Sequence, residues 1–163
     1  MGKTNAVRLL EQQKIPYRLA EYEYDENDLN GMHAAEGIGM PPEQIFKTLV
    51  ARDAKGRILV FCVPVSAELD LKKAAAAAGA KSVALIHVKE LLGLTGYIRG
   101  GCSPIGMKKQ YPTYLDESAL AYPEIGVSAG VRGGQLLLDP WDLISFLPIT
   151  TTALTSEKRN GEI

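Results

Sequence analysis

The stretch "QIFKTLVARDAKGRILVFCVPV", residues 44–65, decides the fold because it holds two strands and the turn between them. "QIFKTLVAR" leads from a short turn of helix into the first strand. "DAKGR" predicts a tight turn in which Gly56 is free to adopt a positive φ. "ILVFCVPV" is apolar on both faces, which is typical of a strand in the middle of a sheet. The stretch therefore predicts a β-hairpin whose second strand is central.

Short helices are expected on both sides of this hairpin. Thr4 can cap the first of them, while Asp70 begins and Gly79 ends a helix that contains five consecutive alanines. Alanine favours helix, and its small side chain lets a helix lie close to a sheet. Pro140 is well placed in the first turn of the last helix. The expected helices cover residues 4–15, 32–39, 71–80, 88–94 and 140–147.

Strands outnumber helices, and they do not alternate with helices in a regular βαβ order. Besides the hairpin, strands are expected at residues 17–25, 82–86, 113–118, 124–130 and 135–139. Tyr22 and Tyr24 share one face of the first of these. The pattern predicts a mixed α/β single domain with a curled, largely antiparallel sheet flanked by short helices. We expect this domain to cover residues 1–150, with a polar tail at residues 151–163.

The composition is ordinary for a soluble globular protein. Of 163 residues, 46% are hydrophobic and 23% are charged. The net charge of -1 argues against a protein that grips nucleic acid by charge alone. The N-terminal stretch lacks the apolar segment of a signal peptide, no run is long enough to span a bilayer, and two cysteines make no disulfide framework. The sequence therefore predicts a cytoplasmic protein without a membrane partner.

No motif for a metal or a cofactor is present. The two histidines, His33 and His87, are too sparse for a metal centre, and neither a Cys-x-x-Cys nor a His-Glu-x-x-His spacing occurs. The glycines between residues 95 and 110 match neither the dinucleotide-binding fingerprint nor the phosphate-binding Walker loop. We expect no bound metal and no cofactor.

The glycine-rich stretch "TGYIRGGCSPIGMKKQ", residues 95–110, raises three possibilities: a surface turn, a nest for an oxygen atom, or a nucleophile site. Cys102 has no histidine beside it in sequence, and a reactive cysteine normally needs a base or a positive neighbour. Ser103 does not lie in the Gly-x-Ser-x-Gly elbow of a hydrolase. We therefore predict no protein nucleophile here. A tight turn and a cradle of backbone amides both remain open.

Among the charged residues, Lys47 most strongly suggests a binding site. It stands at a helix-to-strand junction where apolar side chains are expected, and a lysine in such a place often meets an anion. The alternative is a lysine that snorkels from a strand edge. Lys72, Lys73, Lys108, Lys109 and Arg132 are either solvated surface charges or the border of a site for a polyanion.

Four segments carry a resemblance to a known family. "FKTLV", "LDLKKAAAAAGA", "TGYIRGGCSPIGMKK" and "VSAGVRGGQLLLDPWDL" together resemble the YbaK family of aminoacyl-tRNA editing domains, in order, from the first helix to about Leu147. The resemblance implies a mixed α/β fold around a curled, barrel-like sheet. It also implies hydrolysis of the ester that joins a wrong amino acid to the 3′ end of tRNA, with Cys-tRNA(Pro) as the substrate of the free-standing type.

The same resemblance implies the site residues. Lys47 matches the essential lysine of the family, and Gly100 and Gly101 match the glycines that close the site beside the terminal adenosine. We count these three as catalytic. The predicted substrate-binding residues are Tyr22, Ser103, Pro104, Lys108, Arg132 and Gln135. In two places the chain departs from the family: Gln135 replaces an aspartate of some members, and Cys102 replaces an aliphatic residue.

The resemblance further implies a mechanism in which the thiol of the cysteinyl substrate attacks its own ester. A thiol is appreciably ionised at neutral pH and is intrinsically nucleophilic, so the protein need only hold it near the carbonyl. The alternatives are an Ala-tRNA(Pro) deacylase that uses water, and a nucleotide-binding or small-ligand-binding module without activity. The near-zero charge favours a transient complex with prolyl-tRNA synthetase over autonomous tRNA binding.

Overall fold

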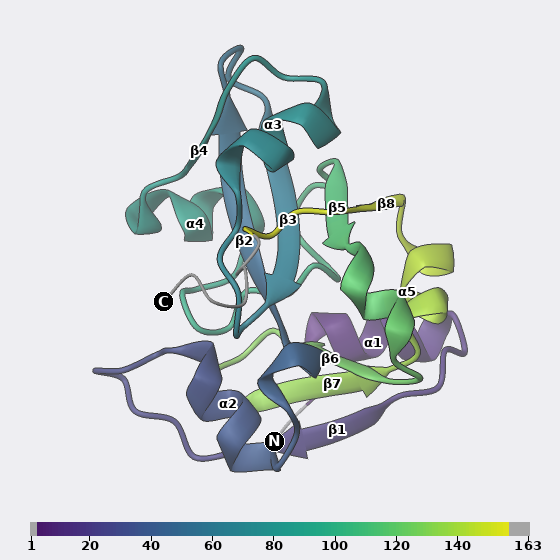
Figure 1. Cartoon of the computed structure of the whole chain (residues 1–163). Helices are drawn as coiled ribbons and strands as arrows, with labels where there is room; N and C mark the ends of the chain where they lie inside the picture. The colour runs from purple at the N-terminus through teal and green to yellow at the C-terminus, as the bar shows by residue number, and fades with distance from the viewer. Residues whose placement is uncertain (1–2, 157–163) are drawn as a thin grey trace, which may run out of the picture.

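The computed structural model describes residues 3–156 and shows a mixed α/β domain with two sheets (Figure 1). The smaller sheet has the order β1–β7–β6 and the larger one β4–β2–β3–β5–β8. The smaller sheet consists of β1 (Arg18–Glu21), β6 (Ile125–Ser128) and β7 (Gly134–Leu138). The larger sheet consists of β2 (Phe46–Asp53), β3 (Ile58–Pro64), β4 (Val83–Leu85), β5 (Thr113–Asp116) and β8 (Ile149–Thr152).

The predicted hairpin is confirmed as β2 and β3. The two strands pair antiparallel from Phe46–Pro64 to Arg52–Ile58, and Gly56 has a φ of 86° in the turn. The buried Asp53 carboxylate organises this turn by accepting hydrogen bonds from two backbone N–H groups and the Arg57 guanidinium. β3 lies in the middle of the larger sheet, as its two apolar faces predicted.

The helices are short and begin and end where the sequence indicates. They are α1 (Asn5–Gln12), α2 (Gly31–Ile38), α3 (Leu71–Ala78), α4 (Val88–Thr95) and α5 (Pro140–Phe146), with 3-10 turns at Pro42–Gln44 and Glu117–Ala121. Thr4 and Asp70 accept hydrogen bonds from the first turns of α1 and α3, and Gly79 ends α3 at a φ of 63°. Ala74 and Ala75 are buried in one cluster with residues of β3, so the alanine run does serve close packing. No helix within residues 3–156 is both long and apolar enough to cross a membrane.

Two features of the sheets differ from the sequence prediction. One curled sheet was expected, whereas the strands form two sheets, because the N-terminal strand pairs with β7 and not with the hairpin. The strand expected at residues 17–25 also ends at Glu21, where the chain turns toward α2. Most pairings are antiparallel, but β5 pairs parallel with both β3 and β8.

β8 was not predicted, and it includes the first two residues of the expected tail. The backbone N–H of the buried Leu154, just beyond β8, donates to the Asp116 carboxylate at 2.8 Å. Residues 157–163 of that tail lie outside the described residues.

The two sheets share the main hydrophobic core, and a backbone bridge also joins the segment before β2 to the smaller sheet. Ile45, just before β2, forms a parallel bridge with Gly126 of β6. A Cβ on Gly126 would lie 2.5 Å from the Ile45 Cδ1 atom, so the absence of a side chain there permits the approach. This sheet joint, residues 45 and 126, places the first residues of β2 over the smaller sheet.

Candidate active site

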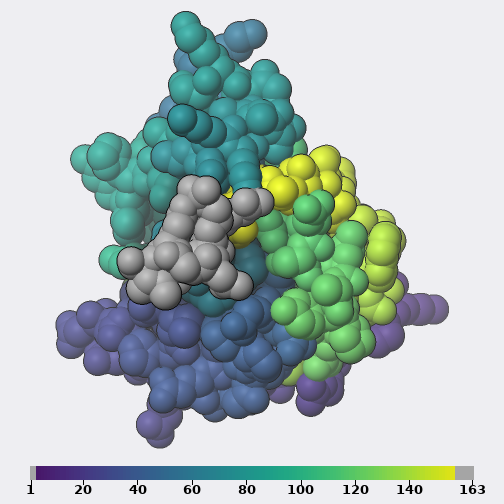
Figure 2. Space-filling model, viewed as in Figure 1, coloured from purple at the N-terminus to yellow at the C-terminus, as the bar shows by residue number. Residues whose placement is uncertain are grey.

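A cleft of about 1230 Å³ opens between the two sheets. The first half of β2, the segment before α2, the start of α4 and the beginning of the glycine-rich stretch contribute to its lining, and Ser128 and Gln135 contribute from the smaller sheet. Figure 2 shows two parts of the surface that contribute lining residues, the segment around α2 in blue below and α4 in teal at the upper left. The volume is ample for a nucleoside that carries an amino acid.

Lys47 projects into this cleft from the second position of β2. Its side chain is 27% exposed, and its Nζ atom lies 3.7 Å from the Glu68 carboxylate. Glu68 is 88% exposed, so water screens this ion pair and it contributes little to stability. The lysine is therefore held by the strand and remains free to exchange Glu68 for an anionic ligand.

Gly100 and Gly101 have different surroundings. Gly100 lines the cleft at a φ of 85°, and its N–H donates to no acceptor within residues 3–156. The Gly101 N–H donates to the Ile98 carbonyl at 2.9 Å, which closes a turn. A Cβ on Gly101 would lie 3.0 Å from the Val131 carbonyl carbon. Gly100 thus lines the cleft with an amide that has no acceptor in the described residues, whereas Gly101 permits close packing of two backbone segments.

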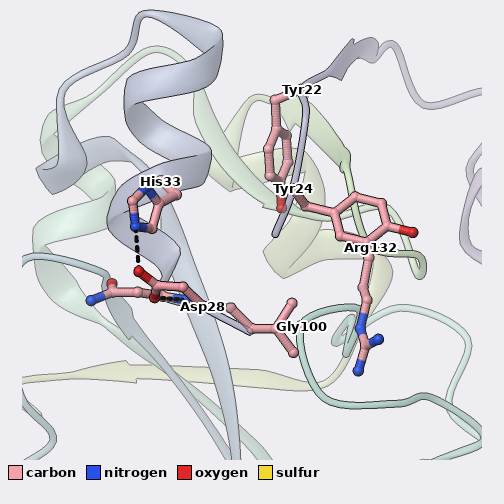
Figure 3. Close-up of a pocket in the computed structure, with 8 residues that line it drawn as sticks. Tyr22, Tyr24, Asp28, His33, Gly100 and Arg132 are labelled. Atoms are coloured by element: carbon pink, nitrogen blue, oxygen red, sulfur yellow. Dashed lines mark hydrogen bonds and ion pairs between the residues drawn. The ribbon is translucent and has the colours of Figure 1, made fainter. Parts of the chain in front are cut away.

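Tyr22 and Arg132 lie beside Gly100 around a small pocket next to the cleft (Figure 3). Tyr22 packs on α2 at Gly37, where a Cβ would lie 2.8 Å from the Tyr22 Cβ. The Arg132 Nε atom donates to the Arg99 carbonyl at 2.8 Å and ties the two loops together. Tyr22 also lines the main cleft, so it connects the two cavities.

His33 and Asp28 form a hydrogen-bonded pair at the rim that the sequence prediction missed. The His33 Nε2 atom lies 2.8 Å from the Asp28 carboxylate, and the two side chains face each other in Figure 3. The hydrogen bond from His33 lowers the pKa of Asp28. Both side chains are more than half exposed, so the pair fixes the segment before α2 without forming a buried catalytic base. Their spacing of five residues across a helix start was the available signal.

Gln135 and Ser128 face each other across the antiparallel pair β6–β7 and form part of the cleft lining. Gln135 is 6% exposed, and its side-chain oxygen has no hydrogen-bond partner within residues 3–156. The Ser128 hydroxyl accepts a hydrogen bond from the Gly130 N–H at 3.1 Å. Ser128 was not predicted, because only the strand register brings it opposite Gln135.

Four predicted residues of the glycine-rich stretch are not part of the cleft lining: Gly101, Ser103, Pro104 and Lys108. Ser103 and Pro104 are buried, and the Ser103 hydroxyl accepts a hydrogen bond from the Ile105 N–H. The Lys108 side chain packs over Gly96, with its Cγ atom 3.2 Å from where a Cβ would stand. The structure therefore brings together Lys47, Gly100, Tyr22, Arg132 and Gln135, and it separates Ser103, Pro104 and Lys108 from them.

Cys102 also lines the cleft, although no role was predicted for it. Burial raises its pKa to about 11, so the side chain is a protonated thiol at neutral pH. Cys62 in β3 is buried as well, and its pKa is raised to about 12 for the same reason. Both are free cysteines. Neither has the depressed pKa of an activated nucleophile.

The charges in the lining are mostly negative. Four carboxylates, those of Glu26, Asp28, Glu43 and Glu68, line the cleft together with two cations, Lys47 and Arg99. Within the described part of the chain, no cluster of three His, Cys, Asp or Glu side chains is placed to hold a metal ion. The arrangement can bind an anion at Lys47 and a carbonyl oxygen at the Gly100 amide, and it contains no activated protein nucleophile.

Comparison with known proteins identifies the class to which this fold and cleft belong. The model of the aminoacyl-tRNA editing domain family matches residues 32–146. An Enterococcus faecalis protein named as a Cys-tRNA(Pro)/Cys-tRNA(Cys) deacylase, EbsC, is 50% identical over 91% of this chain and 94% of its own. The uncharacterised protein YwhH of Bacillus subtilis is 27% identical over 76% of this chain and 78% of its own.

A crystal structure named as that of a trans-editing enzyme for prolyl-tRNA synthetase superimposes with a TM-score of 0.82. It is 27% identical to this chain, and the alignment covers 96% of this chain and all of the other. The chain belongs to the aminoacyl-tRNA editing domain family.

Proposed function

We propose that the protein is a trans-editing deacylase that hydrolyses mischarged Cys-tRNA(Pro). The observation that carries this proposal is the 50% identity, over nearly the whole chain, to a protein named for that activity. The cleft supports it, because its lining includes Lys47 and Gly100, whose N–H has no acceptor within residues 3–156, and its volume suffices for an aminoacylated adenosine. We place the protein in the cytoplasm with its tRNA substrates.

Lys47 and Gly100 have the central roles in this proposal. The Lys47 ammonium binds a phosphate or hydroxyl oxygen of the tRNA 3′ end in place of Glu68. The Gly100 N–H donates to the ester carbonyl oxygen, which gains negative charge as the tetrahedral intermediate forms. Gly101 acts by packing, which fixes the position of its neighbour, and Tyr22 and Arg132 border the pocket for the terminal nucleoside.

The substrate's own thiol serves as the nucleophile. Its sulfur attacks the ester carbonyl, the new C–S bond closes a cyclic thioester, and the C–O bond to the ribose breaks. The thiol proton passes to the departing ribose oxygen, and water then opens the thioester to free cysteine. This route needs no protein nucleophile, in agreement with a raised pKa of Cys102 and an exposed His33 that is paired with Asp28.

A panel of esters tests the proposal. The protein should accelerate hydrolysis of Cys-tRNA(Pro) and leave Ala-tRNA(Pro) and Ser-tRNA(Pro) nearly untouched, because neither substrate carries a thiol. Ser-tRNA(Pro) should nonetheless compete for binding, since a pocket discriminates weakly between side chains that differ by one atom. Rapid release of serine would contradict the substrate-thiol mechanism and indicate an activated water. Release of alanine alone would indicate an Ala-tRNA(Pro) deacylase. No release of any amino acid would contradict the deacylase activity.

A transient complex with prolyl-tRNA synthetase completes the proposal. The net charge of -1 and the negative lining of the cleft give the protein little attraction for a tRNA body, so delivery by a partner is favoured. Co-sedimentation at low salt with synthetase and tRNA should give a ternary complex. Absence of association under those conditions contradicts this part of the proposal and leaves the deacylase activity standing.

A further inference from the structure

Arg99 is a cation of the cleft lining to which the proposed function gives no role. Its side chain is exposed, and within residues 3–156 its guanidinium group makes no hydrogen bond and no ion pair. Lys47, the other cation of the lining, already lies 3.7 Å from the Glu68 carboxylate. A guanidinium presents its N–H donors in a planar fork that matches the oxygens of a carboxylate or a phosphate. Arg99 is therefore available to an anionic ligand of the cleft.

The backbone fixes Arg99 beside Gly100 and leaves its side chain free. The Arg99 carbonyl accepts a hydrogen bond from the Arg132 Nε atom at 2.8 Å. The Gly101 N–H closes a turn around Arg99 by donating to the Ile98 carbonyl at 2.9 Å. Gly100 lines both the main cleft and the small pocket that Arg132 borders (Figure 3). An anion bound by Arg99 in the cleft therefore lies near the ester that Gly100 contacts in the proposed function.

The substrate of the proposed function limits what this anion is. A cysteinyl ester on the ribose of the terminal adenosine carries no negative charge of its own. The nearest negative charge is the phosphate on the 5′ oxygen of the same ribose, which links the adenosine to the preceding nucleotide. Arginine binds phosphate oxygens at two points, and such contacts position a nucleic acid without reading its sequence.

We propose that Arg99 binds the phosphate on the 5′ side of the terminal adenosine and thereby positions the ester beside Gly100. This inference rests on the proposed deacylase function, and it divides the contacts to the tRNA 3′ end between two cations. Arg99 takes the phosphate, and the Lys47 ammonium remains for a hydroxyl oxygen of the ribose. The positive charge of Arg99 also offsets the carboxylates of the lining, which repel a phosphate.

Two substrates that differ by one charge test this contact. The first is a cysteinylated acceptor-stem RNA, and the second has an uncharged methylphosphonate in place of the phosphate next to the terminal adenosine. Arg99→Ala should lower kcat/KM for the charged substrate about 10-fold and leave the uncharged one within about twofold. The variant keeps the carbonyl that accepts from Arg132, so the two loops remain tied. Arg8, an exposed arginine of α1 that lines neither cavity, provides the matched control Arg8→Ala, which removes the same charge.

Salt dependence gives a second readout that a merely structural role would not change. Each phosphate of a single strand that a protein neutralises contributes about 0.7 to the slope of log affinity against log salt concentration. Arg99→Ala should reduce this slope by about 0.7 for the charged substrate, whereas Arg8→Ala should leave it unchanged. Thermal melting checks that the variants are folded, and Arg99→Gln carries the same test if the alanine variant is unstable.

The outcomes separate the inference from the proposed function. Equal losses on both substrates, or no loss on either, show that Arg99 does not act on this phosphate and overturn the inference. A loss in Arg8→Ala as large as that in Arg99→Ala attributes the effect to net charge and overturns it as well. Equally fast hydrolysis of both substrates by the wild type excludes the contact, while the deacylase activity stands. Failure of the wild type to hydrolyse either substrate overturns the proposed function, a result that needs no variant.

Discussion

Residues 99–109 of the glycine-rich stretch form two segments that the sequence presents as one motif. The cleft segment, residues 99–102, supplies lining residues of the cleft, namely Arg99, Gly100 and Cys102. The anchor segment, residues 103–109, contributes none and packs against α1 and Tyr97. Proximity in sequence therefore says little about function here. The cleft segment is expected to govern activity and the anchor segment to govern stability.

Lys47→Ala gives the largest expected effect, and it measures how much a charged residue of the cleft lining contributes to activity without contributing to stability. Loss of the ammonium should reduce deacylation of Cys-tRNA(Pro) by about three orders of magnitude, because the charge that holds the tRNA 3′ end in position for the reaction is removed. The melting temperature should stay within about 2 °C, since the side chain makes only a screened ion pair. Single-turnover kinetics and thermal melting measure the two quantities. Lys55→Ala, in the β2–β3 turn, is the control, and wild-type activity in Lys47→Ala would refute the site assignment.

Gly100→Ala tests the cleft segment directly. The φ of 85° disfavours alanine, and the new Cβ would lie 3.1 Å from Leu29. We expect about a 100-fold loss of kcat/KM, because a small shift of the free amide weakens its bond to the carbonyl oxygen. Measured at a temperature where both proteins are folded, an activity loss below about fivefold would contradict the role of this amide.

Gly106→Ala is the corresponding change in the anchor segment. Its φ is 81°, and a Cβ would lie 2.8 Å from the Asn5 side chain and 2.9 Å from the Tyr97 hydroxyl. The combined strain and overpacking should cost about 2–4 kcal/mol of unfolding free energy. Urea denaturation measures this cost. The folded variant should keep kcat/KM within about threefold, and a selective loss of activity without loss of stability would erase the distinction between the two segments.

Tyr97→Phe removes one hydrogen bond to the anchor segment, at Ile105. The Tyr97 hydroxyl donates to the Ile105 carbonyl at 2.5 Å in a buried position. Its removal leaves that carbonyl without this partner and should cost about 1–2 kcal/mol, which lowers the melting temperature by several degrees. Activity at 25 °C should not change. Differential scanning calorimetry on both proteins measures the melting temperatures, and an unchanged value in Tyr97→Phe would contradict this contribution to stability.

Cys102→Ala has the smallest expected effect, although Cys102 lines the cleft. Burial raises the pKa of the thiol to about 11, so the nucleophilic thiolate is scarce at neutral pH and becomes common only as the pH approaches that value. Activity should remain within a few-fold of wild type between pH 6 and pH 8. Alkylation of Cys102 by iodoacetamide, followed by mass spectrometry, should be slow at pH 7 and rise with pH. A loss of several orders of magnitude in the alanine variant would restore the protein-nucleophile hypothesis.

Sequence reasoning succeeded where local chemistry decides the structure. The β2–β3 hairpin, the Thr4 and Asp70 caps and the glycine at the end of α3 all depend on residues a few positions apart. It failed where distant segments pair. β8 is short and rich in threonine, and only its parallel pairing with β5 makes it a strand.

The candidate site residues show the same difference between what local sequence predicts and what depends on the pairing of distant segments. The resemblance led to Lys47, Gly100 and Gln135, which share the cleft lining. It also selected Ser103 and Lys108 because they belong to the motif, and the turn of the chain after Cys102 directs them elsewhere. Ser128 remained unseen because the register of β6 against β7 cannot be read from the sequence.

The sheet joint at residues 45 and 126 has a consequence for how such an enzyme diversifies. The walls of the cleft belong to different sheets, and Ile45 rests on the bare backbone of Gly126 at the point where the sheets meet. A Cβ on Gly126 would lie 2.5 Å from the Ile45 Cδ1 atom and 3.3 Å from the Gln135 side-chain oxygen, so a side chain there would displace two residues of the cleft lining. Gly126 is absent from the lining of the cleft. The shape of the cleft can therefore change through substitution of a residue that lies outside its lining.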